Sequence, residues 1–96
     1  MIYILNMTNS KEFLNAAMWV KKLKQSPNNN ELLDLYKYYK QATVGDVNIS
    51  KPGIFNLKDQ AKWNSWDSVK GTDKHTSEVE YIKLVNQLIK SYGVNR

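Results

Sequence analysis

The sequence predicts a single all-α domain of four helices. Apolar residues recur at the three- and four-residue steps of a helix through most of the chain, and no segment alternates as a half-buried strand does. Turn-forming Pro, Gly and Asn residues gather in residues 26–30, 44–55 and 71–73, and they divide the chain into four periodic segments. The 96 residues suffice for one hydrophobic core, and two halves would each be too small to form one.

The first helix is predicted to start just after Asn9. Asn9 and Glu12 have the three-residue spacing of an N-terminal capping pair. The apolar positions that follow keep the helical step: Phe13, Ala16, Ala17, Val20 and Leu23. The Ser-Pro-Asn-Asn-Asn run at 26–30 then forms a turn that ends the helix.

The second helix is predicted to begin at an Asn cap and to run to about Thr43. Asn29 or Asn30 is expected as its N-cap, with Glu31 in the first turn, where negative charge is favoured. Residues 44–55 contain two Gly and one Pro and keep no sustained period, so they are expected to form a long ordered connection. Connections of that length are often functional.

Two further helices complete the prediction. One runs from Lys58 to about Val69, and the last runs from about Asp73 to Tyr92, with residues 71–73 closing the former and capping the latter. Gly93 is a stop signal after the last helix. The residues that this helix is expected to bury are Val79, Ile82, Val85, Ile89 and Tyr92.

The second helix carries aromatic and ammonium groups on one stripe. Residues three and four apart are neighbours on a helix, so Tyr36, Tyr39, Lys40 and Thr43 share a face from which Tyr38 is rotated away. This face offers rings for stacking, hydroxyl donors and a positive charge, which together suit a nucleotide-like head group. From the spacing alone, an interhelical packing stripe is the more common explanation.

The charge balance favours an anionic partner. Lys and Arg number 14 against 9 Asp and Glu, which gives a net charge of +5. Every cation except Arg96 is a Lys, whereas base readout in nucleic acids favours bidentate Arg. Lys binds phosphate as a point charge, so a small phosphorylated ligand fits as well as a nucleic acid or an acidic protein, which stay as the alternative.

Catalysis and metal binding have little support in the composition. The chain has no Cys, so it holds no disulfide or thiolate site, and an intracellular location fits best. A nucleophile needs a positioned base, and the one His of the chain, His75, is expected on the surface among polar residues. The apolar run at residues 1–5 is too short for a signal peptide or a membrane span.

Several motifs together resemble the acyl-CoA-binding protein family. They are residues 36–46, 51–53, Lys58 with 61–66, and 70–72, and further matches are Phe13, Ala16, Ala17, Val20, Lys21, Leu23, Pro27, Tyr81 and residues 92–93. The resemblance covers about residues 10–93. It leaves 1–9 as an N-terminal extension and 94–96 as a C-terminal tail.

The resemblance implies a skewed up-down-down-up bundle and a binding function. The family binds medium- to long-chain acyl-CoA thioesters non-covalently, as a cytoplasmic, monomeric carrier and buffer in lipid metabolism. It implies no enzymatic activity, no cofactor and no metal. It also implies no nucleic-acid partner and no stable membrane insertion, while transient contact with membranes or with acyl-CoA-using enzymes stays open.

The resemblance also assigns roles to individual residues. It assigns Tyr36, Lys40 and Lys62 to the ribose 3′-phosphate, Tyr39 and Ala17 to the adenine surroundings, Lys21, Lys58 and Tyr81 to the rest of the head group, and Phe13, Leu32 and Leu33 to the acyl tail. Asp59 and Gln60 depart from the family pattern of a small residue followed by Lys. They make the field between Lys58 and Lys62 less positive, so head-group affinity is expected to be lower than in relatives.

Overall fold

The computed structural model describes residues 9–95, and it confirms an all-α fold with four α-helices. The elements are α2 (Lys11–Trp19), the short 3-10 helix η1 (Val20–Lys22), α3 (Asn29–Thr43), α4 (Leu57–Asp67) and α5 (Lys74–Tyr92). No helix in this part of the chain is long and apolar enough to cross a membrane. Residues 1–8, most of the expected N-terminal extension, and Arg96 of the expected tail lie outside the described residues.

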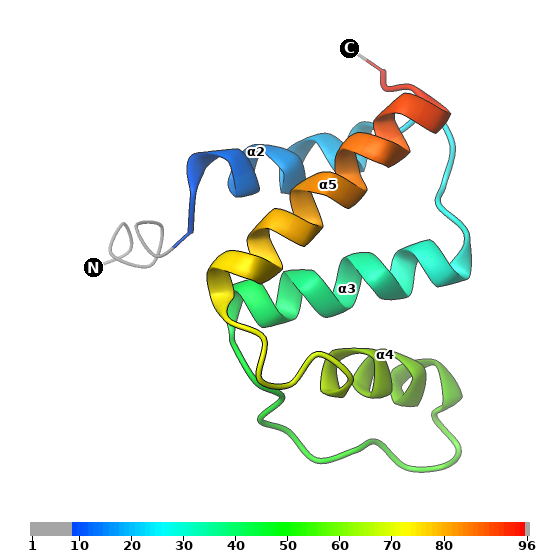
Figure 1. The fold of residues 1–96 in the computed structure, drawn as a ribbon. Coiled ribbons are helices and arrows are strands. Elements are labelled where there is room, and N and C mark those ends of the chain that lie inside the picture. Colours follow the sequence, from blue (N-terminus) through cyan, green and yellow to red (C-terminus); the bar gives the residue numbers. More distant parts are fainter. Residues whose placement is uncertain (1–8, 96) are drawn as a thin grey trace.

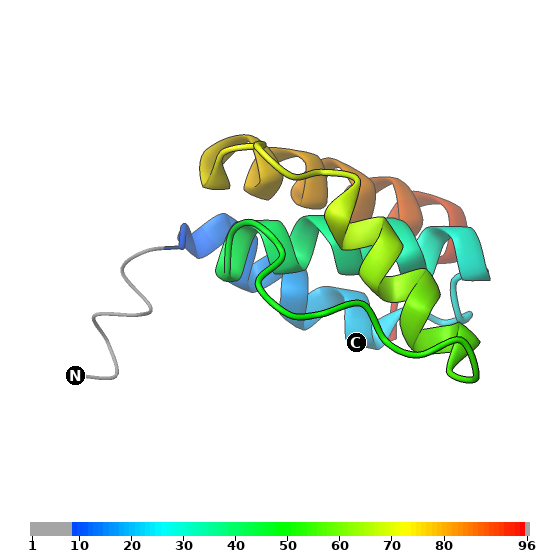
Figure 2. The ribbon, with the colours of Figure 1, turned by 90° about the horizontal axis from the view of Figure 1, so that it is seen from below.

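The helices form the expected up-down-down-up bundle. Figure 1 shows α2 and α5 running in one direction and α3 and α4 in the other, with the 44–56 connection crossing over between α3 and α4. α3 packs against both α4 and α5, and α5 also packs against α2. Figure 2 shows α4 crossing α3 obliquely on the outside of the bundle. α3 is therefore the helix that joins α4 to the rest of the domain.

The core lies between α2, α3 and α5. Its buried side chains are Phe13, Ala16, Leu35, Ala42, Tyr81, Val85 and Leu88. Tyr38, which the helical geometry turns away from Tyr36 and Tyr39, packs against this core. Trp66 of α4 is also buried.

Two predicted helix caps are wrong by one residue. Ser10, and not Asn9, caps α2, because its hydroxyl accepts the Phe13 N–H at 3.1 Å. Asn28, and not Asn29 or Asn30, caps α3 in a capping box with Glu31. In both places adjacent polar residues can all accept this hydrogen bond, so the sequence pattern cannot choose among them.

The buried face of α5 also differs from the prediction. Val85 is buried as expected, and Ile82, Ile89 and Tyr92 are partly buried against the core. Val79 is exposed, while the polar Ser77 and Glu78 are buried together with Tyr81 and Leu88. Because α5 packs against both α2 and α3, its buried face is wider than one apolar stripe. Asp73 and Gly93 delimit the helix as predicted, and Gly93 has φ +72°.

A hydrogen-bonded junction ties the start of the 44–56 connection to the turn between α4 and α5. The Gln41 side-chain amide donates to Asp46 Oδ1 and to the Thr72 carbonyl, both at 2.8 Å. The same Asp46 oxygen accepts the Gly71 N–H at 2.8 Å. These bonds from Gly71 and Gln41 hold the pKa of Asp46 below its ordinary value.

Two glycines and a tryptophan complete this junction. Gly45 and Gly71 have φ of +101° and +90°, which other residues rarely adopt. The Trp66 indole N–H donates to the Gly45 carbonyl at 2.8 Å. The non-helical end of the 36–46 motif thus positions α4 under α3.

The ends of the described chain are held against the bundle. Asn9 donates to the Ala42 carbonyl at 3.0 Å. Leu23 and Val94 form an isolated antiparallel bridge, and Lys24 N–H donates to the Gly93 carbonyl at 3.0 Å. The domain boundaries at residues 10 and 93 stay a prediction, although the residues just beyond them make these contacts.

Candidate functional site

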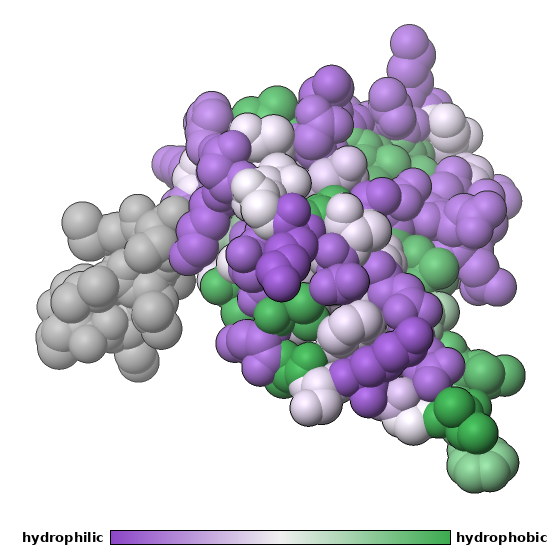
Figure 3. All heavy atoms as spheres, turned by 60° about the horizontal axis from the view of Figure 1, so that its bottom comes forward, coloured by the Kyte–Doolittle hydropathy of each residue, from purple (hydrophilic) through white to green (hydrophobic). Residues whose placement is uncertain are grey.

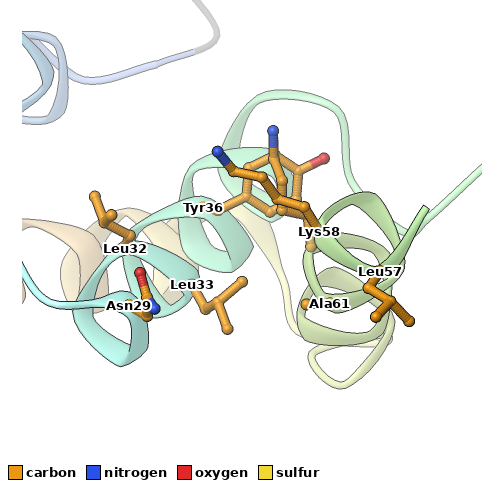
Figure 4. A pocket seen from close by; sticks show the side chains of 8 residues that line it. Asn29, Leu32, Leu33, Tyr36, Leu57, Lys58 and Ala61 are labelled. Atoms are coloured by element: carbon orange, nitrogen blue, oxygen red, sulfur yellow. The ribbon is translucent and has the colours of Figure 1, made fainter. Parts of the chain in front are cut away.

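A groove with a volume of about 740 Å³ lies between α3 and α4. The residues that line it are Asn29, Leu32, Leu33, Tyr36, Leu57, Lys58, Ala61 and Lys62. Figure 4 shows Leu33 and Ala61 pointing toward each other from the two helices, with Tyr36 one turn further along α3. The groove therefore combines an apolar floor with phenol and ammonium groups.

Tyr36 and Lys62 form the polar part of this groove. The Lys62 ammonium lies 5.0 Å from the centroid of the Tyr36 ring, which is within the range of a cation–π contact. Burial, and then the charge of Asp59, raise the pKa of Tyr36 above its ordinary value. The phenol thus keeps its proton at neutral pH and can donate a hydrogen bond to an anion beside Lys62.

A second group of candidate residues lies around Tyr39, one turn beyond Tyr36 on α3. The rings of Phe13 and Tyr39 stack with their centroids 5.8 Å apart, and Tyr81 contacts both rings at 5.0 and 5.9 Å. Tyr39 is 42% exposed and covers the other two. Its outer surface is available to a ligand.

Phe13 and Tyr81, which the resemblance assigns to the acyl tail and to the head group, are both buried. They are 0% and 3% exposed, and their assignment to the ligand stays a prediction. Both side chains fill the space where α2, α3 and α5 meet, because large rings at those positions complete the core. Burial, and then Tyr39, raise the pKa of Tyr81 to about 12, so its hydroxyl stays neutral.

The remaining candidates occupy neither the groove nor this ring cluster. The Lys40 ammonium lies 4.9 Å from the ring centroid of the buried Trp66. Ala17 packs against the core, and Lys21 is exposed in η1. Tyr36, Tyr39 and Lys40 do share one side of α3, but each has a different neighbour.

The structure adds groove residues that the sequence did not single out. Asn29, Leu57 and Ala61 line the groove beside Leu32 and Leu33. The helical spacing of Leu57 and Ala61 places them on one face, but the helix was predicted to start one residue later, at Lys58. From the sequence, Asn29 is expected only as a candidate N-cap of α3.

The described part of the chain contains no group of three or more His, Cys, Asp or Glu side chains that could hold a metal ion. His75 is exposed near the start of α5, as expected. What the groove offers is an apolar surface next to ammonium and phenol donors. This combination suits an amphipathic anion.

The comparisons with known proteins agree with this geometry. The family model described as acyl-CoA-binding protein matches residues 10–85. The chain is 52% identical to acyl-CoA-binding protein homolog 1 of Caenorhabditis elegans, over 84% of this chain and 94% of that protein. It is 51% identical to the acyl-CoA-binding protein of Saccharomyces cerevisiae, over 88% of this chain and 97% of that protein.

The fold agrees as well. The crystal structure of acyl-CoA-binding protein 2 from Oryza sativa superposes with a TM-score of 0.81 at 44% sequence identity, and the match covers 84% of this chain and 88% of that one. With a matched family model, close relatives over nearly their whole length and the same four-helix arrangement, this chain belongs to the acyl-CoA-binding protein family.

Proposed function

We propose that this protein binds medium- to long-chain acyl-CoA thioesters non-covalently and serves as their carrier and buffer in lipid metabolism. The observation that supports this most directly is the groove between α3 and α4, where leucines adjoin the Tyr36–Lys62 pair. An acyl-CoA has both an apolar tail and a phosphorylated head. A groove with one apolar and one cationic part meets both requirements.

The acyl tail is assigned to the apolar part of the groove. Leu32 and Leu33 of α3 and Leu57 and Ala61 of α4 line this space. Each methylene that leaves water there contributes about 0.8 kcal/mol at full burial.

The phosphates are assigned to the ammonium groups beside the tail. Lys58 and Lys62 line the groove, and Tyr36 supplies a hydroxyl donor next to Lys62. Lys40, one turn beyond Tyr36 on α3, is assigned to the ribose 3′-phosphate together with this pair. Lys21 is assigned to the outer part of the head group, since it is exposed in η1, just after α2.

The adenine is assigned to the exposed surface of the Tyr39 ring, with Ala17 nearby. Phe13 and Tyr81 lie beneath this ring and do not reach the surface. Their proposed part is to hold Tyr39 in a fixed orientation, so they act as positioning residues. A rigid ring loses little entropy when a base stacks on it.

The proposal includes no chemical change of the ligand. Tyr and Lys side chains here bind and orient, and the relatives are named as binding proteins. We further assign the protein to the cytoplasm as a monomer, with acyl-CoA as its ligand and no other cofactor.

Isothermal titration tests the function directly. Palmitoyl-CoA is expected to bind one-to-one, far more tightly than palmitate or CoA alone, with a negative heat-capacity change from apolar burial. Equal affinity for palmitate and palmitoyl-CoA would contradict the proposal, because the lysines and tyrosines would then contribute nothing. Binding of nucleic acid without any binding of palmitoyl-CoA would favour the alternative of a basic helical module.

A further inference from the structure

A turn just before α4 exposes large apolar side chains. Residues 53–56 form a turn in which the Asn56 N–H donates to the Gly53 carbonyl at 3.0 Å. Ile54 and Phe55 occupy its apex and are 72% and 98% exposed, and the adjoining Leu57 is 73% exposed. We call Ile54, Phe55 and Leu57 the apolar tip. Figure 3 shows apolar atoms projecting at the corner of the molecule where the connection enters α4.

The apolar tip is not explained by the turn or by the groove. Turn apices usually carry Gly, Asn, Asp, Pro or Ser, each for a backbone reason that Ile and Phe do not share. Of the three side chains, only Leu57 lines the groove, and Figure 4 shows it pointing outward from α4. Adjacent apolar side chains exposed to this degree mark an interaction site or an aggregation hazard.

The backbone beneath the tip is held in place. Asn56 caps α4, and its side-chain amide donates to Asp59 Oδ2 at 2.7 Å. The Gln60 side-chain amide donates to the Pro52 carbonyl at 2.9 Å, which fixes the other side of the turn. Ile54 and Phe55 are thus presented on an ordered support.

The charges around the tip are mainly positive. Lys51 lies before the turn and Lys58 follows it in the first turn of α4, and both are exposed. Asp59 is the acidic residue of this first turn. Counting these three side chains, the surroundings of the tip carry one net positive charge, and the whole chain carries +5. An apolar projection with cations beside it is complementary to an anionic lipid surface.

We propose that the apolar tip inserts into the interfacial region of anionic lipid bilayers and docks the protein there reversibly. The tip is convex, and a bilayer accepts a convex apolar group without a matching cavity. A second copy of the chain is a poorer partner, because three side chains cannot supply the roughly 800 Å² per subunit of a stable protein interface.

Docking at the tip has a consequence that rests on the proposed function. Leu57 belongs both to the tip and to the groove lining, so insertion brings the groove to the membrane surface. An acyl-CoA could then pass between bilayer and groove with its tail shielded from water. The docking itself requires no ligand, and it can be measured on the ligand-free protein.

Co-sedimentation with vesicles tests the docking. The ligand-free protein is expected to bind phosphatidylcholine vesicles that contain phosphatidylserine, and to bind less as salt is raised. The double variant I54S/F55S is expected to lose at least about tenfold in partition coefficient, since its apolar contact is gone. M18S is the matched control, because Met18 is 53% exposed on α2, away from the tip, and it should bind like wild type. Equal binding of I54S/F55S and wild type would overturn the proposal.

Two further measurements distinguish insertion from other forms of attachment. Lipids brominated along their chains should quench the added fluorescence of F55W but not that of M18W; equal quenching of both would refute insertion at the tip.

K51Q should weaken vesicle binding about three- to fivefold, while the remote K90Q should change it less. If sedimentation equilibrium instead finds a dimer that I54S/F55S abolishes, and no vesicle binding, the tip is a self-association site and the proposal fails.

These results separate the docking from the function proposed above. Wild-type affinity of I54S/F55S for palmitoyl-CoA in the absence of vesicles, with lost vesicle binding, supports a docking role distinct from the groove. Failure of vesicle binding with intact palmitoyl-CoA binding refutes the docking alone.

Discussion

Glu78 is a buried carboxylate that no sequence motif points to. It lies on α5, where its Oε2 atom accepts hydrogen bonds from the Asn9 side-chain amide at 2.8 Å and from the Ser10 N–H at 2.9 Å. These donors stand at the N-terminus of α2, whose helix dipole also favours a negative charge. One side chain thereby joins the start of α2 to α5.

Removing this carboxylate should destabilise the fold. Glu78→Ala is expected to lower the free energy of unfolding by about 2–3 kcal/mol, because two donors to a charged group lose their acceptor. Urea unfolding provides the measurement. Glu80→Ala is the matched control. Glu80 forms a surface ion pair with Lys83 at 3.6 Å, and its replacement should change stability by less than about 1 kcal/mol. Similar losses for the two variants would mean that the Glu78 bonds stabilise little.

Lys62 and Lys40 provide a test at the ligand. Either one replaced by Ala is expected to weaken palmitoyl-CoA binding by about 1.5–3 kcal/mol, through loss of a charge-assisted hydrogen bond to phosphate. The loss should be much smaller with palmitoyl-dephospho-CoA, which lacks the ribose 3′-phosphate. Dissociation constants for both ligands decide the matter, with Lys90→Ala as a control for net charge. An equal loss for both ligands would show that the assignment to this phosphate is wrong.

At the scale of elements, helices were easier to predict than the contacts between them. Periodicity and turn residues placed all four helices within a few residues, because these signals are local. The burial of Phe13 and Tyr81 depends on three helices meeting, and no local pattern reports it. For the same reason the burial of Glu78 could not be predicted, since its partners Asn9 and Ser10 are almost 70 residues away in the sequence.

The junction at Asp46 shows why part of the family-like motif is structural. Asp46 accepts from Gln41 on α3 and from Gly71 in the turn before α5, so it joins two segments that flank α4. Position 46 thus affects how α4 is held under α3, and through it the width of the groove. Tyr36, Tyr39 and Lys40 are the residues of this motif that we assign to the ligand, while Gln41 and Asp46 hold the framework.

Asp46 should make stability depend on pH in a defined direction. Its pKa is held below the ordinary value near 3.8 by hydrogen bonds from Gly71 and Gln41, so the carboxylate form stabilises the fold. That stabilisation is present above the unfolded-state pKa and is lost as pH falls through the lower folded-state pKa. Asp46→Asn should therefore be less stable than wild type at neutral pH, and the difference should shrink in acid. The urea midpoints of wild type and Asp46→Asn should be compared at neutral pH and at a pH below about 3. If the difference between the two midpoints did not change with pH, the Asp46 carboxylate would not be the source of the stabilisation.

At the scale of the whole molecule, α4 joins the bundle through its contact with α3. Among the described elements it packs against α3, whereas α3 and α5 each contact two other helices. Beyond this packing, α4 is connected through Trp66, whose indole bonds to Gly45, and through Ser65, whose hydroxyl donates to the Leu33 carbonyl at 2.8 Å. The groove lies along this same α3–α4 boundary. A ligand there would contact both helices at once.

Ligand binding should therefore stabilise the entire fold. A ligand that binds only the folded state at 100 times its dissociation constant adds about 2.7 kcal/mol to the free energy of unfolding. For a chain of this size that corresponds to an increase in Tm of roughly 10–20 °C. Thermal unfolding with palmitoyl-CoA should show this increase, while palmitate or CoA at the same concentration should raise Tm far less.

Amide hydrogen exchange adds the location of the effect. Without ligand, α4 should exchange faster than α3 and α5, since fewer packed neighbours lower the free energy of local opening. With palmitoyl-CoA, protection should increase most in α4, because the ligand adds contacts to a helix that packs against one other helix of the described structure, α3. Two outcomes would contradict this prediction. An equal increase of protection in all four helices would show that α4 opens only when the whole fold unfolds. An increase confined to α2 and α5 would place the ligand at the rings of Phe13, Tyr39 and Tyr81 and away from the groove.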